Sequence, residues 1–378
     1  MFRVFGVSLL LLVSTAPLAL AAPFQTDAKQ AIIVDHETGI VLFEKDARRP
    51  MPPASMTKIM TAFMVFEALE RGDIQEDTLL TVSEEAWRRG GVQSGSSTMF
   101  LDVNSQVPVI DLLRGVIIQS GNDACIVLAE GLAGSEDAFA RRMTSRAKEL
   151  GLDSATFRNA TGWPDEEHEI SAADLAKLSN LLIERFPDRY ELYSERSYEW
   201  NGIEQSNRNP LLGRFTGADG VKTGSTEVSG YGLVGSAERD GVRRTIVING
   251  LESQRERATA AVEIMSAAFR DFDTLSLYDS GSEVGDVTVY MGRADTVGVV
   301  LRDDVKMGFL RTDRNDIGAR IDYTDVPAPV EAGDRIAELV LTMSGEETAR
   351  YPLYATESVR RKGFFGRAGA SLIQKIRG

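Results

Sequence analysis

The distribution of apolar residues along the chain is first strand-like, then helical, and then strand-like again. Short apolar runs at 31–34 and 40–43 flank a polar turn, and short alternating runs return from about residue 198. Between them, apolar residues recur with the helical period. Strands at both ends with helices between them favour one antiparallel sheet that is built from the two ends and covered by the helices. The pattern therefore predicts an α+β domain over residues 26–273.

The individual elements follow from the apolar runs and from their capping and turn residues. The predicted helices are 59–69, a short one after Ser83, 108–118, 123–132, 135–150, 171–185 and 254–272. The predicted strands are 31–34, 40–43, 78–82, 219–224, 230–236 and 245–249, together with a hairpin over 198–205 that turns at Asn201-Gly202.

A second, smaller domain is expected over residues 275–353. This segment lacks helical periodicity and contains alternating runs such as 287–290 and 337–341, which predict an all-β domain. No cluster of chemically reactive side chains accompanies these runs. Two roles remain open for this domain, a spacer or a binding surface for a partner.

Both ends of the chain have targeting signatures. Residues 1–21 combine Arg3, an apolar run and a final Ala-Leu-Ala, which predicts a cleaved secretory signal peptide and an exported protein. Residues 358–378 contain several basic residues and no acidic one, and their apolar side chains fall on one helical face. This pattern predicts an amphipathic helix on an anionic membrane surface. The alternative is a helix that docks on its own domain. No other stretch approaches 18 consecutive apolar residues.

Charge and composition exclude several functions. The net charge is −14, and loss of Arg3 with the signal peptide makes it −15, which argues against binding to nucleic acid. The single cysteine, Cys125, lies in an apolar run and is expected to be a buried structural thiol. Two histidines, His36 and His168, give weak support to a Ser-His-Asp triad, and neither a metal site nor a cofactor is expected.

The most informative short motif is Ser55-Met56-Thr57-Lys58. Pro52-Pro53 brings the chain in extended, and the residues after Lys58 are apolar nearly all round, which predicts a buried helix with Ser55 at its N-terminal end. Lys58 lies one turn later, where its amine reaches the serine oxygen. A second copy, Ser145-x-x-Lys148, lies on a helix face expected to be solvated. Spacing alone therefore does not decide between the two copies.

Two further polar segments interrupt apolar elements, Ser120-Gly121-Asn122 and Lys222-Thr223-Gly224. A serine needs an adjacent base to become a nucleophile, and a lysine serves as that base when burial and a second cation lower its pKa. We expect Lys58 to be the base and Lys222 the second cation. Ser120 would relay the proton, Asn122 would bind a substrate amide, and Lys222 with Thr223 would bind a carboxylate. Backbone N–H groups at Ser55 and just after Gly224 would form an oxyanion hole.

These segments resemble the signature motifs of the serine D-Ala-D-Ala carboxypeptidases, the low-molecular-mass penicillin-binding proteins of the type 5 and 6 group. The similarity extends over 53–58, 119–124 and 219–224 and includes 95–101, 207–209 and 363–367. It implies a β-lactamase-like fold and the removal of terminal D-alanine from peptidoglycan pentapeptides through an acyl-serine that β-lactams also form. It further implies a periplasmic enzyme attached peripherally to the outer face of the cytoplasmic membrane, with Arg208 and Arg257 helping to bind substrate. Ser225 stands where family members have histidine, so rate or preference is expected to differ.

Four alternatives stay open at this point. A β-lactamase would need a rapid deacylation, and the loop 159–169 contains three glutamates without the glutamate-to-asparagine pattern of that class. A D,D-transpeptidase or an endopeptidase would share the motifs and differ in the acceptor or in the bond cleaved. A non-enzymatic receptor that is acylated and signals would need a transmembrane helix.

Overall fold

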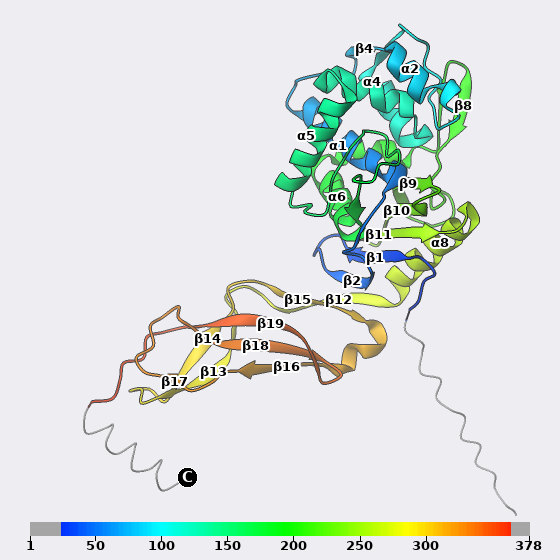
Figure 1. The fold of residues 1–378 in the computed structure, drawn as a ribbon. Coiled ribbons are helices and arrows are strands. Elements are labelled where there is room, and N and C mark those ends of the chain that lie inside the picture. The colour runs from blue at the N-terminus through cyan, green and yellow to red at the C-terminus, as the bar shows by residue number, and fades with distance from the viewer. Residues whose placement is uncertain (1–23, 364–378) are drawn as a thin grey trace, which may run out of the picture.

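The computed structural model describes residues 24–363, and Figure 1 shows how the elements are arranged. The predicted targeting segments, 1–21 and 364–378 of the C-terminal one, lie outside this range. Residues 358–363, at which the predicted C-terminal helix begins, are not helical, because Val359 pairs with Val330 and Arg361 with Gly292 in the all-β part. No helix within residues 24–363 has the length and apolarity needed to cross a bilayer.

The N-terminal part contains a five-stranded antiparallel sheet in the order β2-β1-β11-β10-β9, which confirms the expectation of one sheet built from both ends of the segment. Its strands are β1 (Gln30–Asp35), β2 (Val41–Lys45), β9 (Ala218–Thr226), β10 (Gly230–Arg239) and β11 (Val242–Leu251). Successive residues Ile32 and Ile33 belong to different apolar clusters, so both faces of the sheet are covered. Helix α8 (Gln254–Arg270) packs on one face.

A helical lobe covers the other face. Its centre is α1 (Lys58–Glu70), in which all but two residues are buried, as the nearly continuous apolar run predicts. Around it lie α2 (Glu84–Gly90), α3 (Val109–Arg114), η3 (Gly115–Gln119), α4 (Asn122–Ala133), α5 (Glu136–Glu149) and α6 (Ala172–Arg185). The lobe and this face of the sheet share one apolar cluster.

Short elements complete this part of the chain. They are β3 (Pro50–Met51), η1 (Ala54–Thr57), β4 (Leu79–Thr81), η2 (Val92–Ser94), β5 (Gln106–Pro108), β6 (Ile170–Ser171), α7 (Pro187–Tyr190), η4 (Glu191–Ser194), β7 (Ser197–Trp200) and β8 (Ile203–Ser206). The expected hairpin is present as β7–β8, and Asn201 and Gly202 both have positive φ, as its tight turn requires.

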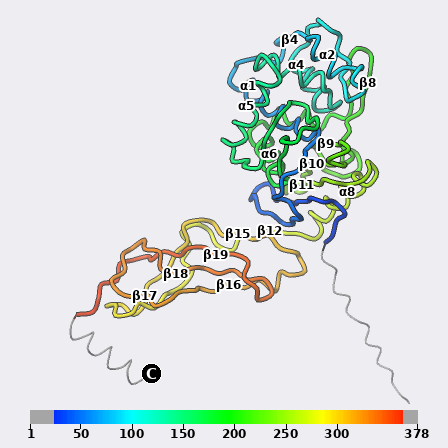
Figure 2. Tube along the Cα trace, viewed as in Figure 1, coloured from blue at the N-terminus to red at the C-terminus, as the bar shows by residue number. Residues whose placement is uncertain are grey.

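The C-terminal part is all-β apart from one 3₁₀ segment. It comprises β12 (Phe272–Tyr278), β13 (Glu283–Tyr290), β14 (Thr296–Val300), β15 (Val305–Leu310), η5 (Arg311–Asp316), β16 (Ile317–Asp322), β17 (Val326–Pro327), β18 (Arg335–Met343) and β19 (Glu346–Ala355). Strands β12 and β15 form a ribbon, and the others form a six-stranded sheet over a separate apolar cluster. The tube in Figure 2 shows the ribbon connecting the two parts.

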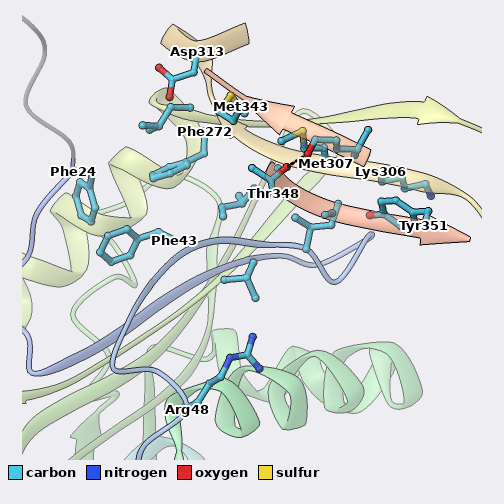
Figure 3. Close-up of a pocket in the computed structure, with 17 residues that line it drawn as sticks. Phe24, Phe43, Arg48, Phe272, Lys306, Met307, Asp313, Met343, Thr348 and Tyr351 are labelled. Carbon is cyan, nitrogen blue, oxygen red and sulfur yellow. Dashed lines mark hydrogen bonds between the residues drawn. The ribbon is translucent and has the colours of Figure 1, made fainter. Parts of the chain in front are cut away.

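A groove of about 870 Å³ lies between β2 and the C-terminal strands (Figure 3). Phe24, Phe43 and Phe272 pack against one another at one end of the groove, with ring centroids 5.0–6.5 Å apart. Gly308 of β15 approaches β2 so closely that an added Cβ would lie 2.7 Å from side-chain carbons of Ile40 and Leu42. The groove is remote from the polar motifs and has no evident chemistry of its own.

Two of the predicted helices end earlier in the structure than the sequence pattern indicates. The helix expected over 108–118 is α3 followed by the π-helical turn η3, because Gly115 brings the chain against Met99. An added Cβ there would lie 2.3 Å from the Met99 sulfur. The last helix ends at Arg270, and Phe272 begins β12 instead.

Candidate active site

The Ser55 motif forms a tight turn at the entrance of α1. Residues Ala54–Thr57 form the 3₁₀ turn η1, and the α-helix begins at Lys58, one residue before the predicted helix 59–69. Two glycines permit the close packing of this turn. An added Cβ at Gly224 would lie 2.7 Å from the Pro53 carbonyl oxygen and 3.1 Å from the Ser55 nitrogen, and one at Gly162 would overlap the Ala54 carbonyl. Strand β9 and the loop after α5 therefore hold the nucleophile turn from two sides.

The Lys58 amine is buried next to the serine hydroxyl. Its Nζ lies 3.1 Å from Ser55 Oγ, 2.7 Å from Asn122 Oδ1 and 2.6 Å from the Thr161 carbonyl oxygen. An ammonium donates to all three. A neutral amine has two N–H bonds and one lone pair, so donation to Asn122 and Thr161 leaves the lone pair directed at the Ser55 hydroxyl. The two fixed acceptors thus orient the amine as a base.

Burial makes neutral lysine accessible near physiological pH. Loss of hydration lowers the pKa of Lys58 from 10.5 to about 8, and the Arg208 charge adds to the lowering. Burial also lowers the pKa of Lys222 well below its ordinary value, with the charge of Lys58 as the next contribution. The charges of the two lysines therefore disfavour each other, and Arg208 is a further positive neighbour of Lys58. Within residues 24–363, Lys222 Nζ has one hydrogen-bond acceptor, the Thr223 carbonyl at 3.4 Å.

Ser120 and Asn122 enter the site through an irregular helix junction. The π-helical turn η3 ends at Ser120, which is buried and has left-handed backbone angles of φ 61° and ψ 32°. A non-glycine residue in this region is strained by about 1–3 kcal/mol, and such strain concentrates at functional sites. The junction brings Ser120 to the wall of the pocket that also contains Ser55, while Asn122 begins α4 and bridges Lys58 and Ser96 Oγ.

A buried carboxylate fixes this junction to a neighbouring segment. Asp123 accepts hydrogen bonds from Thr98 Oγ1 at 2.7 Å and from the backbone nitrogens of Met99, Leu101 and Ala124 at 2.8–3.2 Å. Burial raises the pKa of Asp123, and these four hydrogen bonds oppose that shift. These hydrogen bonds to Asp123 hold the segment that contains Ser97 at the edge of the pocket.

The pocket beside Ser55 has a volume of about 260 Å³ and a cationic wall. Its lining residues are Ser55, Ser97, Ser120, Arg208, Thr223, Gly224, Ser225, Tyr231, Gln254 and Arg257. Arg208 is held by Ser97 Oγ. Arg257 is 5% exposed, its Nε has no hydrogen-bond partner among residues 24–363, and burial lowers its pKa to about 10. Gln254 begins α8, so the positive end of that helix also faces the pocket. An anion with planar oxygens fits this wall. We name it the anion pocket.

The loop 158–168 supplies a group that the sequence motifs did not indicate. Asn159 Oδ1 accepts from Thr161 Oγ1 and from the backbone nitrogens of Thr161, Gly162 and Trp163 at 2.7–3.2 Å, which fixes the Thr161 carbonyl against Lys58. The only sequence signal is the local Asn-x-Thr-Gly spacing, which favours such a turn. His168 is buried beneath the turn and contacts Thr57 Oγ1 rather than Ser55, and burial lowers its pKa to about 4.

The structure thus gathers the predicted residues Ser55, Lys58, Ser120, Asn122 and Lys222 around one site, with Thr223, Gly224, Ser225, Arg208 and Arg257 in the adjoining pocket. Ser145 of the second Ser-x-x-Lys copy is exposed on α5, as expected. Cys125 is also buried as expected, and its pKa is raised to about 12.

Comparison with known proteins assigns the family. Residues 16–252 match the family model described as D-alanyl-D-alanine carboxypeptidase, and 272–361 match the penicillin-binding protein 5 C-terminal domain. The chain is 33% identical to the D-alanyl-D-alanine carboxypeptidase DacA of Escherichia coli K12, over 91% of this chain and 86% of that protein. The chain belongs to the D-alanyl-D-alanine carboxypeptidase family. The chain is also 35% identical to the D-alanyl-D-alanine carboxypeptidase DacC of E. coli K12, over 93% of this chain and 88% of that protein.

Solved structures named as a D-alanyl-D-alanine carboxypeptidase or as penicillin-binding proteins have the same fold. The DacD carboxypeptidase of Francisella tularensis superimposes with a TM-score of 0.83 at 28% identity, covering 90% of this chain and 95% of that one. Penicillin-binding protein 5 of Haemophilus influenzae gives 0.73 at 32%, covering 90% and 99%. Penicillin-binding protein D2 of Listeria monocytogenes, solved in an ampicillin-bound form, gives 0.57 at 30%, covering 65% and 99%. The α+β class with an all-β C-terminal part is therefore confirmed.

Proposed function

We propose that this chain is a serine carboxypeptidase that removes the terminal D-alanine from peptides ending in D-Ala-D-Ala, as in the peptidoglycan stem, and that β-lactams acylate the same serine. The observation that carries the proposal is the distance of 3.1 Å between a buried amine, whose pKa is lowered to about 8, and the Ser55 hydroxyl, beside a cationic pocket. The relatives named as D-alanyl-D-alanine carboxypeptidases support the substrate class.

The reaction begins with proton transfer from Ser55 to neutral Lys58. The Oγ then bonds to the carbonyl carbon of the penultimate D-alanine, and the oxygen of that carbonyl becomes an oxyanion that backbone N–H groups at Ser55 and Ser225 stabilise. The carbon–nitrogen bond breaks, and the departing amine takes a proton relayed from Lys58 through Ser120. Lys58, now neutral again, takes a proton from a water molecule whose oxygen attacks the acyl-serine carbonyl. The bond from that carbonyl to Ser55 Oγ then breaks, and Ser55 recovers the proton from Lys58 as the shortened peptide leaves.

Substrate binding uses the exposed edge of the sheet. Strand β9 is the last strand of the sheet, so its outer edge can pair with an extended peptide. The leaving D-alanine directs its carboxylate toward Arg208, Arg257 and Thr223 in the anion pocket, with Lys222 adding a donor behind them. Asn122 donates its amide to a carbonyl of the peptide.

The test compares two serine variants. Wild-type protein releases D-alanine from a pentapeptide that ends in D-Ala-D-Ala, Ser55→Ala releases none, and the matched Ser145→Ala variant is unchanged because Ser145 is exposed on α5. Circular dichroism and thermal unfolding confirm that both variants fold. Unchanged release by Ser55→Ala would exclude Ser55 as the nucleophile. Supplying an acceptor amine separates hydrolysis from transpeptidation, since a transpeptidase forms a new peptide at the expense of free acid.

We further propose that the protein acts outside the cytoplasmic membrane and attaches to its outer face through residues 364–378 of the basic C-terminal segment. The signal-like sequence of residues 1–21 and the basic, apolar character of the C-terminal segment support this. Removal of residues 364–378 should release the protein from membranes while leaving D-alanine release unchanged. Continued sedimentation of the shortened protein with membranes would refute the attachment.

A further inference from the structure

Asp219 belongs to the sequence motif 219–224, yet it does not line the anion pocket. It instead joins a cluster of polar side chains near the start of β9. Its Oδ1 accepts a hydrogen bond from the Tyr190 hydroxyl at 3.0 Å, and its Oδ2 accepts one from Arg243 Nη1 at 2.6 Å. Arg243 also donates to Ser236 Oγ at 2.7 Å. We name Tyr190, Asp219, Ser236 and Arg243 the Asp219 cluster.

The Asp219 cluster connects one helix with three neighbouring strands. Tyr190 is the last residue of α7. Asp219, Ser236 and Arg243 lie on β9, β10 and β11, which follow one another in the sheet (Figure 1). Tyr190 is 5% exposed, and the Arg243 side chain is 15% exposed. Because removal of either partner would leave a poorly hydrated charge, the ion pair between Asp219 and Arg243 is costly to break.

The Tyr190 ring also packs directly on the backbone of β9. An added Cβ at Gly220 would lie 2.3 Å from the Tyr190 hydroxyl oxygen and 3.0 Å from the ring carbon that carries it. On the other side, the ring stacks on that of the buried Tyr193, with the two centroids 5.3 Å apart. The hydroxyl is therefore confined between β9 and the neighbouring ring, where it contacts Asp219.

Asp219 lies at an irregularity in the pairing of β9 with β10. From Thr226 back to Gly220, every residue of β9 has a partner on β10. The next pair is Ala218 with Ala237, so Asp219 is an extra residue without a partner on β10. Such a β-bulge leaves the extra residue outside the ladder, and pairing can shift there by one residue. The side-chain hydrogen bonds of Asp219 therefore fix the strand at the point where the ladder does not.

The register of β9 sets the positions of groups that bind the substrate. Lys222 follows Asp219 by three residues, about 10 Å along the strand, and Thr223 lines the anion pocket. Within residues 24–363, the Lys222 amine has one hydrogen-bond acceptor, the Thr223 carbonyl at 3.4 Å, so its position depends on the backbone of β9. A shift by one residue would move both side chains about 3.3 Å and turn each to the opposite face.

We propose that the Asp219 cluster fixes the register of β9 and thereby places Lys222 and Thr223 for binding of the substrate carboxylate. This inference rests on the proposed carboxypeptidase function and deepens it. The members of the cluster are positioning residues, since none of them lines the anion pocket. Loss of the cluster displaces the groups that bind the carboxylate. Ser55 and Lys58 are less affected, because they belong to η1 and α1 rather than to β9. KM should therefore rise more than kcat falls.

The experiment measures release of D-alanine from a pentapeptide that ends in D-Ala-D-Ala, with rates expressed per site that fluorescent penicillin labels. Tyr190→Phe removes one hydroxyl and keeps the ring, and it should raise KM about threefold. Asp219→Ala removes both hydrogen bonds of the carboxylate and should raise KM about tenfold, with kcat reduced less than about threefold. Asp219→Asn keeps one acceptor oxygen and should have an intermediate KM.

A purely structural role would give a different result. A loss of stability lowers the number of sites that penicillin labels, but it leaves the KM of the folded fraction unchanged. Arg146→Gln is the matched control, because it removes a partner of the buried Glu67 at the end of α1 remote from Ser55. It should lower the unfolding temperature and leave KM unchanged. Hydrogen–deuterium exchange of residues 218–226 should become faster in Asp219→Ala and stay unchanged in Arg146→Gln.

Failure of this inference is distinguishable from failure of the proposed function. If wild-type protein releases D-alanine and both Tyr190→Phe and Asp219→Ala have the wild-type KM, the inference is overturned and the proposed function stands. If Asp219→Ala does not fold, the KM of Tyr190→Phe decides, because that variant keeps the packing of the ring. If wild-type protein releases no D-alanine, the proposed function fails, and the inference fails with it.

Discussion

Removal of the Arg208 charge should shift the pH dependence of Ser55 acylation. The active form of Lys58 is the neutral amine, so the acylation rate constant rises with pH through the pKa of about 8 and then levels off. A lysine with the ordinary pKa of 10.5 is neutral in only about 0.03% of molecules at pH 7, whereas one with a pKa of 8 is neutral in about 9%. Burial therefore raises the population of the base about 300-fold, equivalent to about 3.4 kcal/mol.

Arg208→Gln removes one of the charges that lower the pKa of Lys58. The pKa should rise, so the rising limb of the profile moves to higher pH and the rate constant at pH 7 falls, while the plateau at high pH is retained. Because the charges of Lys58 and Lys222 affect each other, the rising part of the pH–rate profile gives an apparent pKa that belongs to both amines.

The assay is stopped-flow acylation by a chromogenic cephalosporin between pH 5.5 and 10. Saturating concentrations isolate the acylation rate constant from the loss of carboxylate binding that the variant also causes. Between pH 6 and pH 8 the wild-type rate constant should increase about 50-fold. Arg141→Gln, a variant of an exposed arginine on α5, is the matched control and should leave the profile unchanged. A flat wild-type profile would refute lysine as the base, and an Arg208→Gln profile that coincides with the wild-type profile would refute the effect of Arg208 on the pKa of Lys58.

Variants at three further positions test which contacts hold the site in place. Gly224→Ala should abolish acylation with little loss of secondary structure, because its Cβ would lie 2.7 Å from the Pro53 carbonyl; a normal penicillin acylation rate would contradict this. Asp123→Ala should lower the free energy of unfolding by about 3–5 kcal/mol in a urea titration, since it leaves buried backbone N–H groups without acceptors. A loss below about 1 kcal/mol would show that the hydrogen bonds to Asp123 do not stabilise the fold. Asn159→Ala should slow acylation about tenfold to a hundredfold by releasing the Thr161 carbonyl, and Asn159→Asp, which keeps the acceptor oxygen, should restore part of it; equal rates for the two would show that the oxygen is not needed.

The sequence predicts those features of the fold that depend on local periodicity. The buried α1, the five-stranded sheet and the β7–β8 hairpin follow from runs of apolar residues and from one Asn-Gly turn. The π-helical turn before Ser120 does not follow from such patterns, because it depends on Gly115 packing against Met99, which is distant in sequence. The position of this turn is therefore known only from the folded structure.

In the site, too, some features can be predicted from the sequence and others cannot. Residues that act through their side chains, such as Ser55, Lys58 and Asn122, belong to short motifs with distinctive spacing and can be found in the sequence. The Thr161 carbonyl is a backbone group, and any residue could supply it, so the sequence contains no direct signal for its contact with Lys58. The effect of the Arg208 charge on Lys58 likewise becomes evident only in the folded chain.

The identity of the acylated serine tests the central claim most directly. The protein is treated with benzylpenicillin, digested with trypsin and analysed by mass spectrometry. The account predicts that the penicilloyl group is confined to the peptide 49–58, which contains Ser55, and that it is absent from Ser55→Ala. An adduct on the peptide 143–146, which contains Ser145, or an adduct that persists in Ser55→Ala, would contradict the account.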